Sequence, residues 1–292
     1  MNLDLVYTNN FKEAGKYRNK GYEPVECAFG EKGSVVGPLV LDHHCQYSSE
    51  EPVSLKSFKL VVEKGISCHK FVATGQADPD SIYSMLVLSG EIKPSLEISA
   101  SIAQMDLDPI GLDRLTEPNI RVPAFEMLYT PGKSRRNHLD ALDIGKLVFD
   151  SDPLGDEIKS RIPDFEERRN RLVEEEIIMN NEDVLFLETD LPHRDVAHKY
   201  APLIIQYKPG LKIITFSGLS RIAAKKLHKV SVYDLFGPTG LNKIYSLVEP
   251  ILGPGSGGRE EIGGSHRERE VSREEAIRVY WRTVEYKRRF NP

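Results

Sequence analysis

Residues 70–88 read KFVATGQADPDSIYSMLVL, and this stretch decides the fold class. Lys70 to Thr74 is a short apolar run that predicts a strand, and Asp78 to Leu88 has apolar residues at helical spacing. Asp78 stands directly before Pro79, which suits a helix start because proline fits the first helical turn. A strand that leads straight into a helix is the unit from which helix-covered parallel sheets are built.

The same alternation continues on both sides of this stretch. Before it we expect strands at Leu3–Tyr7, Pro24–Phe29 and Pro38–Leu41, and helices at Phe11–Arg18 and Pro52–Val62. Near the C-terminus we expect strands at Val184–Leu187, Leu203–Tyr207 and Lys212–Phe216, and helices at Leu241–Ile251 and from Ser272 to about Arg289.

The segment 137–180 is highly charged with a helical period, which predicts a long, solvent-exposed connecting helix. The predicted fold is therefore α/β: an N-terminal, mainly parallel sheet with flanking helices in residues 1–136, a helical linker at 137–180, and a smaller C-terminal α/β domain at 181–292.

Composition narrows the class of protein. The 292 residues carry 39 Lys and Arg against 44 Asp and Glu, a net charge of −5, which argues against binding long duplex DNA through bulk charge. Three cysteines without paired spacing make no disulfide framework, and no run is long and apolar enough for a membrane helix. We expect a cytoplasmic protein without a membrane segment, and the sequence leaves a homodimer open.

Three consecutive metal-ligand types, Asp42, His43 and His44, directly follow the apolar run at 38–41. Ligands at the C-terminal end of a buried strand are where α/β proteins place their sites. Two further carboxylates, Asp78 and Asp80, crowd the next strand end, and carboxylates packed together repel one another unless a cation lies among them. This predicts a metal site of Asp42, His43, Asp78 and Asp80 for Mn²⁺ or Mg²⁺.

Two other segments carry candidate chemistry. Asp106 and Asp108, the latter before Pro109, are interpreted as a helix cap rather than as a further ligand group. A glycine-rich loop near residues 253–267 combines pliable backbone with cationic side chains, which favours phosphate binding. Its candidate substrate-binding residues are Gly257, Gly258, Arg259, Gly263, Gly264, Ser265, His266 and Arg267.

These motifs resemble those of the DHH phosphoesterase superfamily, which includes RecJ-like exonucleases, nano-RNA phosphodiesterases and family II pyrophosphatases. The triplet Asp42-His43-His44 gives the superfamily its name, and the glycine-rich loop is similar to its GGGH-type motif. The resemblance implies an N-terminal domain with divalent ions, usually Mn²⁺, a linker helix, and a smaller substrate-binding domain.

The sequence departs from the superfamily at its opening His-x-Asp-x-Asp motif. Strand Leu3–Tyr7 is followed by Thr8-Asn9-Asn10, and the segment GQADPDS has Gln76 where a histidine is expected. Either the strands are rearranged, or Asp78 and Asp80 belong to a later aspartate motif. A single ion, weak binding and lost activity are all compatible with these departures.

The resemblance implies a metal-dependent hydrolase in which His43 and His44 are catalytic. We expect it to hydrolyse a phosphodiester or phosphoanhydride of a small nucleotide or short oligonucleotide in a cleft between two domains. The alternative is a non-catalytic protein that binds a nucleotide or phosphate metabolite through a degenerate metal site.

Overall fold

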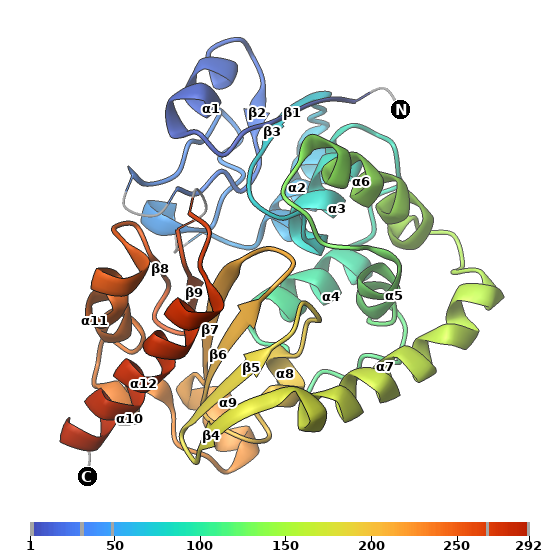
Figure 1. Ribbon diagram of the computed structural model, residues 1–292. Helices are drawn as coiled ribbons and strands as arrows, with labels where there is room; N and C mark the ends of the chain where they lie inside the picture. The colour runs from blue at the N-terminus through green and yellow to red at the C-terminus, as the bar shows by residue number, and fades with distance from the viewer. Residues whose placement is uncertain (1–2, 30–31, 48–49, 267–268, 291–292) are drawn as a thin grey trace. The chain divides into compact units, whose positions relative to one another are not determined.

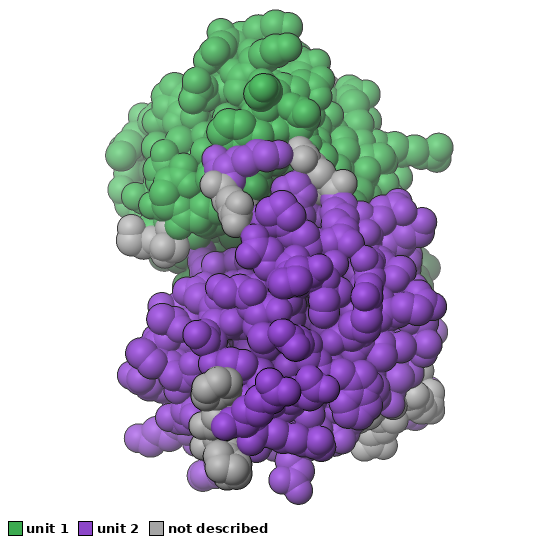
Figure 2. All heavy atoms as spheres, turned by 60° about the vertical axis from the view of Figure 1, so that its left-hand side comes forward, with its two compact units in different colours: residues 1–29, 33–167 green, residues 30–32, 168–292 purple. Residues whose placement is uncertain are grey.

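A computed structural model describes residues 3–29, 32–47, 50–266 and 269–290, with the side chains of 172–177 and 290 outside the description. The chain divides into two compact units, which are described separately. Unit 1 comprises residues 1–29 and 33–167, and unit 2 comprises residues 30–32 and 168–292 (Figure 2).

Unit 1 is built on a small parallel sheet. Its strands are β1 (Asp4–Tyr7), β2 (Glu23–Pro24) and β3 (Lys70–Ala73), and they lie in the order β1-β3-β2 (Figure 1). Both pairings with β3 are parallel. The central position of β3 confirms that the strand at 70–74 organises the N-terminal sheet.

Two predicted strands of unit 1 are wrong in extent. Strand β2 ends at Pro24, so 25–29 forms no strand, and neither does 38–41; isolated bridges join Val25 to Leu41 and Ala28 to Ser34. The backbone explains this, because Glu26 and Val40 have φ values of 49° and 52°, and left-handed residues interrupt an extended ladder.

Helices cover this sheet and complete unit 1. They are α1 (Phe11–Arg18), the 3₁₀ turn η2 (Cys45–Tyr47), α2 (Val53–Lys64), α3 (Pro79–Leu88), α4 (Leu96–Leu107), α5 (Arg121–Leu128) and α6 (Arg135–Phe149). Helix α3 is buried along nearly its whole length, which explains its nearly continuous apolar sequence, and it belongs to the main core of unit 1.

The segment 137–180 is not one exposed helix. It contains α6, which ends at Phe149, then α7 (Asp156–Glu176), and then the start of strand β4. Ala141, Leu142, Val148 and Phe149 are buried in the core of unit 1, so α6 is a core helix of that unit. Its charged residues lie on the opposite face, which is why its sequence alone looked solvent-exposed.

Unit 2 has a mixed six-stranded sheet in the order β4-β5-β6-β7-β9-β8. The strands are β4 (Ile177–Asn181), β5 (Val184–Glu188), β6 (Leu203–Lys208), β7 (Ile213–Gly218), β8 (Gly257–Gly258) and β9 (Ile262–Gly264). Its helices are α8 (Arg194–Ala197), α9 (Arg221–Leu227), α10 (Val232–Phe236), α11 (Asn242–Leu252) and α12 (Arg273–Phe290).

The core of unit 2 lies where α11 and α12 pack against the sheet. Buried side chains of strands β5 to β7, among them Phe186 and Phe216, form one cluster with Val248 and Tyr280 from the two helices. The predicted class is confirmed: an α/β protein with a parallel N-terminal sheet and a C-terminal α/β region. No helix in the described residues is long and apolar enough to cross a membrane.

Candidate metal centre

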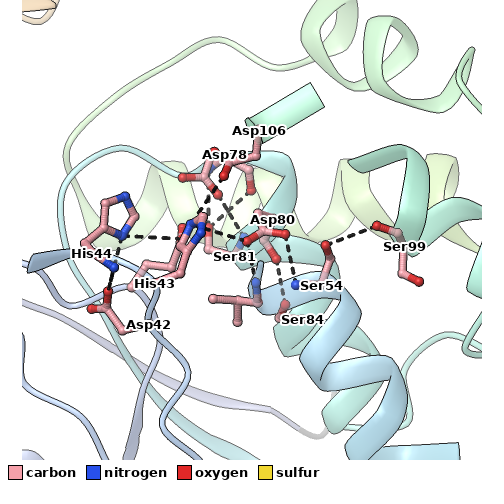
Figure 3. A network of polar contacts seen from close by, with 12 residues as sticks. Asp42, His43, His44, Ser54, Asp78, Asp80, Ser81, Ser84, Ser99 and Asp106 are labelled. Atoms are coloured by element: carbon pink, nitrogen blue, oxygen red, sulfur yellow. Dashed lines mark hydrogen bonds and ion pairs between the residues drawn. The ribbon is translucent and has the colours of Figure 1, made fainter. Parts of the chain in front are cut away.

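Carboxylates and imidazoles gather at one end of the unit 1 sheet (Figure 3). Glu26 follows β2, the triplet at 42–44 lies in the loop that pairs back to it, and Asp78 and Asp80 open α3. Asp106 comes from the last turn of α4. The parallel strand order places these segments together, since the C-terminal ends of β2 and β3 meet at one edge.

His43 lies at the middle of this group and is fully buried. Its Nε2 lies 2.9 Å from Oε1 of Glu26, 3.4 Å from Oδ2 of Asp106 and 3.8 Å from Oδ2 of Asp80. One imidazole therefore faces three carboxylates that come from three separate segments of the chain.

His44 and Asp42 form a pair beside it. Oδ1 of Asp42 accepts a 2.6 Å hydrogen bond from the backbone amide of His44 and lies 3.2 Å from Nδ1 of its ring. The same Nδ1 is 3.8 Å from Oε1 of Glu26. Asp42 thus orients the His44 ring through Nδ1, and the His44 side chain, one third exposed, is reachable from solvent.

The second oxygen of Asp42 is in a different position. Oδ2 is buried and has no hydrogen-bond partner within the described chain. A buried carboxylate oxygen without a donor is costly, so such an atom calls for an explanation. A bound cation would satisfy it.

Asp80 has a different set of partners. Its Oδ2 accepts from the amide of Val53 at 2.8 Å, and its Oδ1 accepts from the amide of Ser54 at 2.9 Å. These are the first amides of α2, which has no side-chain cap at its own N-cap residue. Asp80 therefore caps α2 from α3, although each carboxylate oxygen keeps a second lone pair.

Asp78 serves as the N-cap of α3. Its Oδ1 accepts from the amide of Ser81 at 2.8 Å, and Ser81 Oγ lies near the Asp78 amide in return, which completes a capping box. The sequence prediction of Asp78 as a helix cap is thus confirmed. Repulsion from the Asp78 carboxylate also raises the pKa of Glu26.

The carboxylates of the centre repel one another. Burial raises the pKa of Glu26 well above the usual range for a glutamate, and repulsion from Asp78, Asp80, Asp106 and Asp42 raises it further. Burial and then the charge of Asp106 also raise the pKa of Asp80, although hydrogen bonding from Ser54 opposes that rise. Protons would have to neutralise part of this cluster if no metal did.

The donor set fits a divalent cation. Ligand atoms of Glu26, His43 and His44 all lie within 4.8 Å of one another, and Oδ1 of Asp42 lies 3.2 Å from Nδ1 of His44. Carboxylate oxygens with imidazole nitrogens suit Mn²⁺ and Mg²⁺, with the imidazoles favouring the former.

Sequence reasoning missed two members of this centre. Glu26 lies in an apolar run that was interpreted as a strand, yet a lone carboxylate in a buried strand is itself a signal. Asp106 was interpreted as part of a helix cap, which is wrong, because it lies inside the last turn of α4 and near His43. Asp108 makes a local turn, its Oδ1 accepting from the Ile110 amide at 3.3 Å.

The glycine-rich segment lies in unit 2 and is part of the sheet. Strands β8 and β9 form an antiparallel hairpin, and β9 pairs with β7. A Cβ on Gly263 would lie 2.4 Å from both the Gly257 carbonyl oxygen and the Tyr245 hydroxyl, and one on Gly264 would lie 2.5 Å from the Ile214 carbonyl oxygen. Sheet packing therefore explains these two glycines before any ligand is invoked.

The remaining predicted substrate-binding residues have mixed surroundings. The Arg259 carbonyl accepts from Tyr245, Ser265 pairs with Ile214 through backbone and hydroxyl, and the His266 ring lies beside Gly255. Gly257 has open space where a Cβ would lie, whereas Gly258 is enclosed by β9 backbone. Arg267 lies outside the described residues.

Comparison of the sequence with known protein families and with curated proteins gives no match. Two solved structures are similar at 11% identity. One is RecJ from Thermus thermophilus in complex with Mg²⁺, over 81% of this chain and 34% of that chain, with a TM-score of 0.35. The other is a DHH domain described as belonging to a family of ribosomal proteins. The match covers 97% of this chain and 69% of that chain, with a TM-score of 0.33.

The chain thus spans about one third of the RecJ chain. One match is a RecJ and the other is described as a DHH domain. With TM-scores below 0.5 they identify neither the residues that act nor a substrate, so function has to be argued from the centre in unit 1.

Proposed function

We propose that unit 1 carries a divalent-metal-dependent phosphoesterase centre. The observation that supports it is the convergence of ligand atoms of Glu26, His43 and His44 within 4.8 Å of one another at the end of a parallel sheet. The residues that would hold Mn²⁺ or Mg²⁺ are Glu26, Asp42 and His43, with Asp78 and Asp106 completing the acidic shell. Asp80 would hold α2 in place while contributing charge.

Each side chain then has a chemical task. When bound, the cation supplies a more acidic water and neutralises charge that builds on the transferring phosphoryl group. Glu26 and Asp42 concentrate negative charge in a buried setting, so they favour a cation over a proton once one is present. His43 is fixed between carboxylates and presents an imidazole nitrogen to the site.

His44 suits proton transfer. Asp42 orients its ring through Nδ1, which leaves Nε2 for a leaving oxygen, and its side chain is more exposed than those of Asp42 and Glu26. A histidine oriented by a carboxylate through one ring nitrogen can give a proton through the other. We therefore assign His44 as the general acid.

The substrate class we propose is a small phosphorylated molecule: a phosphodiester or phosphoanhydride in a nucleotide or short oligonucleotide. An acidic chain disfavours long duplex DNA, and a site in which negative charge is concentrated needs the cation as a bridge to any phosphate. The glycine-rich hairpin of unit 2 remains the proposed phosphate-binding element, with Gly257, which has open space where a Cβ would lie, and the half-buried Arg259 as its candidates.

The test is hydrolysis of bis(p-nitrophenyl) phosphate, pyrophosphate, dinucleotides and short oligonucleotides with Mn²⁺ or Mg²⁺. Glu26→Gln and His43→Ala should lose at least about a hundredfold in kcat/KM. His44→Ala should lose activity chiefly on substrates with poor leaving groups, since a good leaving group needs no proton. Glu23→Gln is the matched control: it alters a buried glutamate three positions before Glu26 and should keep full activity.

Two outcomes would overturn the proposal. Full activity in Glu26→Gln and His43→Ala would place catalysis elsewhere. Tight Mn²⁺ binding that is lost in Glu26→Gln, with no hydrolysis of any substrate, would establish the alternative of a binding protein without turnover.

A further inference from the structure

The last helix, α12, exposes an arginine-rich face that includes Trp281, the only tryptophan of the chain. Trp281 is 47% exposed, which is unusual for the largest apolar side chain. Arg278, Glu285, Arg288 and Arg289 lie three, four, seven and eight positions from it and share its side of the helix, as does Glu274 seven positions before it, and Arg282 follows it directly.

The positive charge of this face is poorly compensated. Arg282, Arg288 and Arg289 are exposed, and none has an ion pair within the described part of the chain. Arg278 reaches Glu275 only at 4.0 Å, and Glu274 and Glu285 are the exposed acids on this side of the helix. The chain has more acidic than basic residues, so a cluster of arginines beside an exposed aromatic ring is an unusual feature of its surface.

The opposite face of α12 is buried. Ala276, Val279, Tyr280 and Val284 are buried in the core of unit 2, where α12 packs on α11 and on strands β5 and β6 (Figure 1). A membrane-surface helix needs a broad free apolar face, and a stable protein interface needs an apolar centre. The exposed face offers one aromatic ring surrounded by charged side chains.

Single-stranded nucleic acid fits that combination. Its bases stack on single exposed aromatic rings, and its phosphates pair with guanidinium groups. Trp281 and Arg288 are two turns apart, about 10 Å along the helix axis, which separates a stacking point from a phosphate contact. We propose that the Arg278–Arg289 face of α12 binds single-stranded RNA or DNA, with Trp281 stacking a base and Arg282, Arg288 and Arg289 holding phosphates.

The test uses a labelled oligouridylate of about ten nucleotides and fluorescence anisotropy at low and moderate salt. Trp281→Ala should weaken binding about five- to a hundredfold, and Trp281→Phe should restore part of it because an aromatic ring remains. Arg288→Ala combined with Arg289→Ala should lower the slope of log affinity against log salt by about 1.4, or about 0.7 for each phosphate that an arginine no longer neutralises.

Lys225→Ala combined with Lys226→Ala is the matched control, since it removes two exposed cations from α9 of the same unit. It should leave affinity within about twofold, because two cations outside the α12 face add only non-specific attraction. Binding should also persist in EDTA and in Glu26→Gln, so this proposal and the metal centre can fail separately. Quenching of the tryptophan emission by unlabelled oligouridylate gives an independent readout, because Trp281 is the only tryptophan.

Three results would overturn the proposal. They are no binding at low salt, binding that is unchanged by the Trp281 and arginine substitutions, and binding to phosphatidylserine vesicles but not to the oligonucleotide. Circular dichroism of each variant checks that the fold is intact, and the exposure of these side chains predicts that it is.

Discussion

The backbone amide of Ser54 donates a 2.9 Å hydrogen bond to Oδ1 of Asp80, although the two residues are 26 positions apart. Together with the Val53 amide on Oδ2, this bond joins the N-terminus of α2 to the first turn of α3. The geometry makes Asp80 a structural part of the candidate metal centre as well as one of its charges.

Replacing Asp80 by alanine should therefore destabilise the protein by about 2 to 3 kcal/mol, because two buried amides lose a charged acceptor. Asp78→Ala should cost less, about 1 kcal/mol, since it removes an N-cap at a partly exposed helix start. Urea unfolding in EDTA measures both. Asp80→Asn keeps one acceptor oxygen and should recover part of the loss; equal stability of all three variants would contradict the capping role.

Removing divalent metal should lower the melting temperature of the wild-type protein. Glu26 is buried among Asp42, Asp78, Asp80 and Asp106, and a cation that binds only the folded state stabilises it by mass action. Calorimetry with Mn²⁺ and with EDTA checks this. The shift should vanish in Glu26→Gln and remain in Glu23→Gln, and a shift of equal size in both variants would place the ion elsewhere.

The sequence predicted the elements that local patterns control. Helix α1 has the predicted bounds, and α3 begins after Asp78 as the Asp-Pro signal indicates. Strand pairing was less accessible, because the bridge from Val25 to Leu41 depends on residues far apart in the chain. The left-handed backbone at Glu26 and Val40 leaves no periodic signal, so two strands were expected where mostly bridges form.

The candidate centre was likewise predictable only in part from the sequence. The triplet at 42–44 and the Asp78–Asp80 pair could be recognised as ligand types at strand ends. Glu26 and Asp106 could not be assigned to the centre, since each reaches His43 only through the packing of β2 and α4. The glycines at 263 and 264 suggested a phosphate loop, whereas the close packing of β7, β8 and β9 accounts for them.

Glu23 should make stability depend on pH near neutrality. It is buried, its Oε1 accepts from the Leu39 amide at 3.1 Å, and burial raises its pKa from 4.5 to about 7, against the opposing effect of Leu39. A carboxyl group whose pKa is raised on folding stabilises the folded protein most at pH values below the pKa that the group has in the unfolded chain. That stability is lost as pH rises from about 4.5 through about 7.

Glu23→Gln keeps the acceptor and removes the charge. At pH 8 the variant should be more stable than the wild type by at most about 3 kcal/mol, and the difference should shrink toward pH 4. Urea midpoints at several pH values measure this difference. A constant offset across the range would show that Glu23 does not titrate on folding.

His198 should produce the opposite pH dependence in unit 2. Its ring is buried between the Ala201 carbonyl oxygen at 3.1 Å and Ser217 Oγ at 2.9 Å, and burial lowers its pKa from 6.5 to about 4. The carbonyl can only accept, so Nδ1 carries the proton and Nε2 accepts from the serine. Stability from this group is complete above pH 6.5 and is lost as pH falls toward 4.

Nitrogen-15 NMR of the imidazole should show that tautomer, neutral at pH values between its folded and unfolded pKa. His198→Asn can still donate to Ala201, so it should be less stable at pH 7 but lose less stability between pH 6.5 and 4. An imidazole that becomes charged at its unfolded pKa of 6.5 would contradict the buried, neutral assignment.

Two glycines of the β8–β9 hairpin separate packing from ligand binding. Gly263→Ala would bring a methyl group within 2.4 Å of the Gly257 carbonyl oxygen and the Tyr245 hydroxyl, whereas Gly257→Ala meets no atom within 4 Å. Overpacking of this kind costs about 1 to 3 kcal/mol, so only Gly263→Ala should lower the melting temperature.

If the hairpin binds phosphate through close backbone approach, Gly257→Ala should weaken substrate binding at unchanged stability, since its methyl group would occupy that open space. Calorimetry and KM measured on the same two variants distinguish these effects, and unchanged KM in Gly257→Ala would remove that glycine from the substrate site.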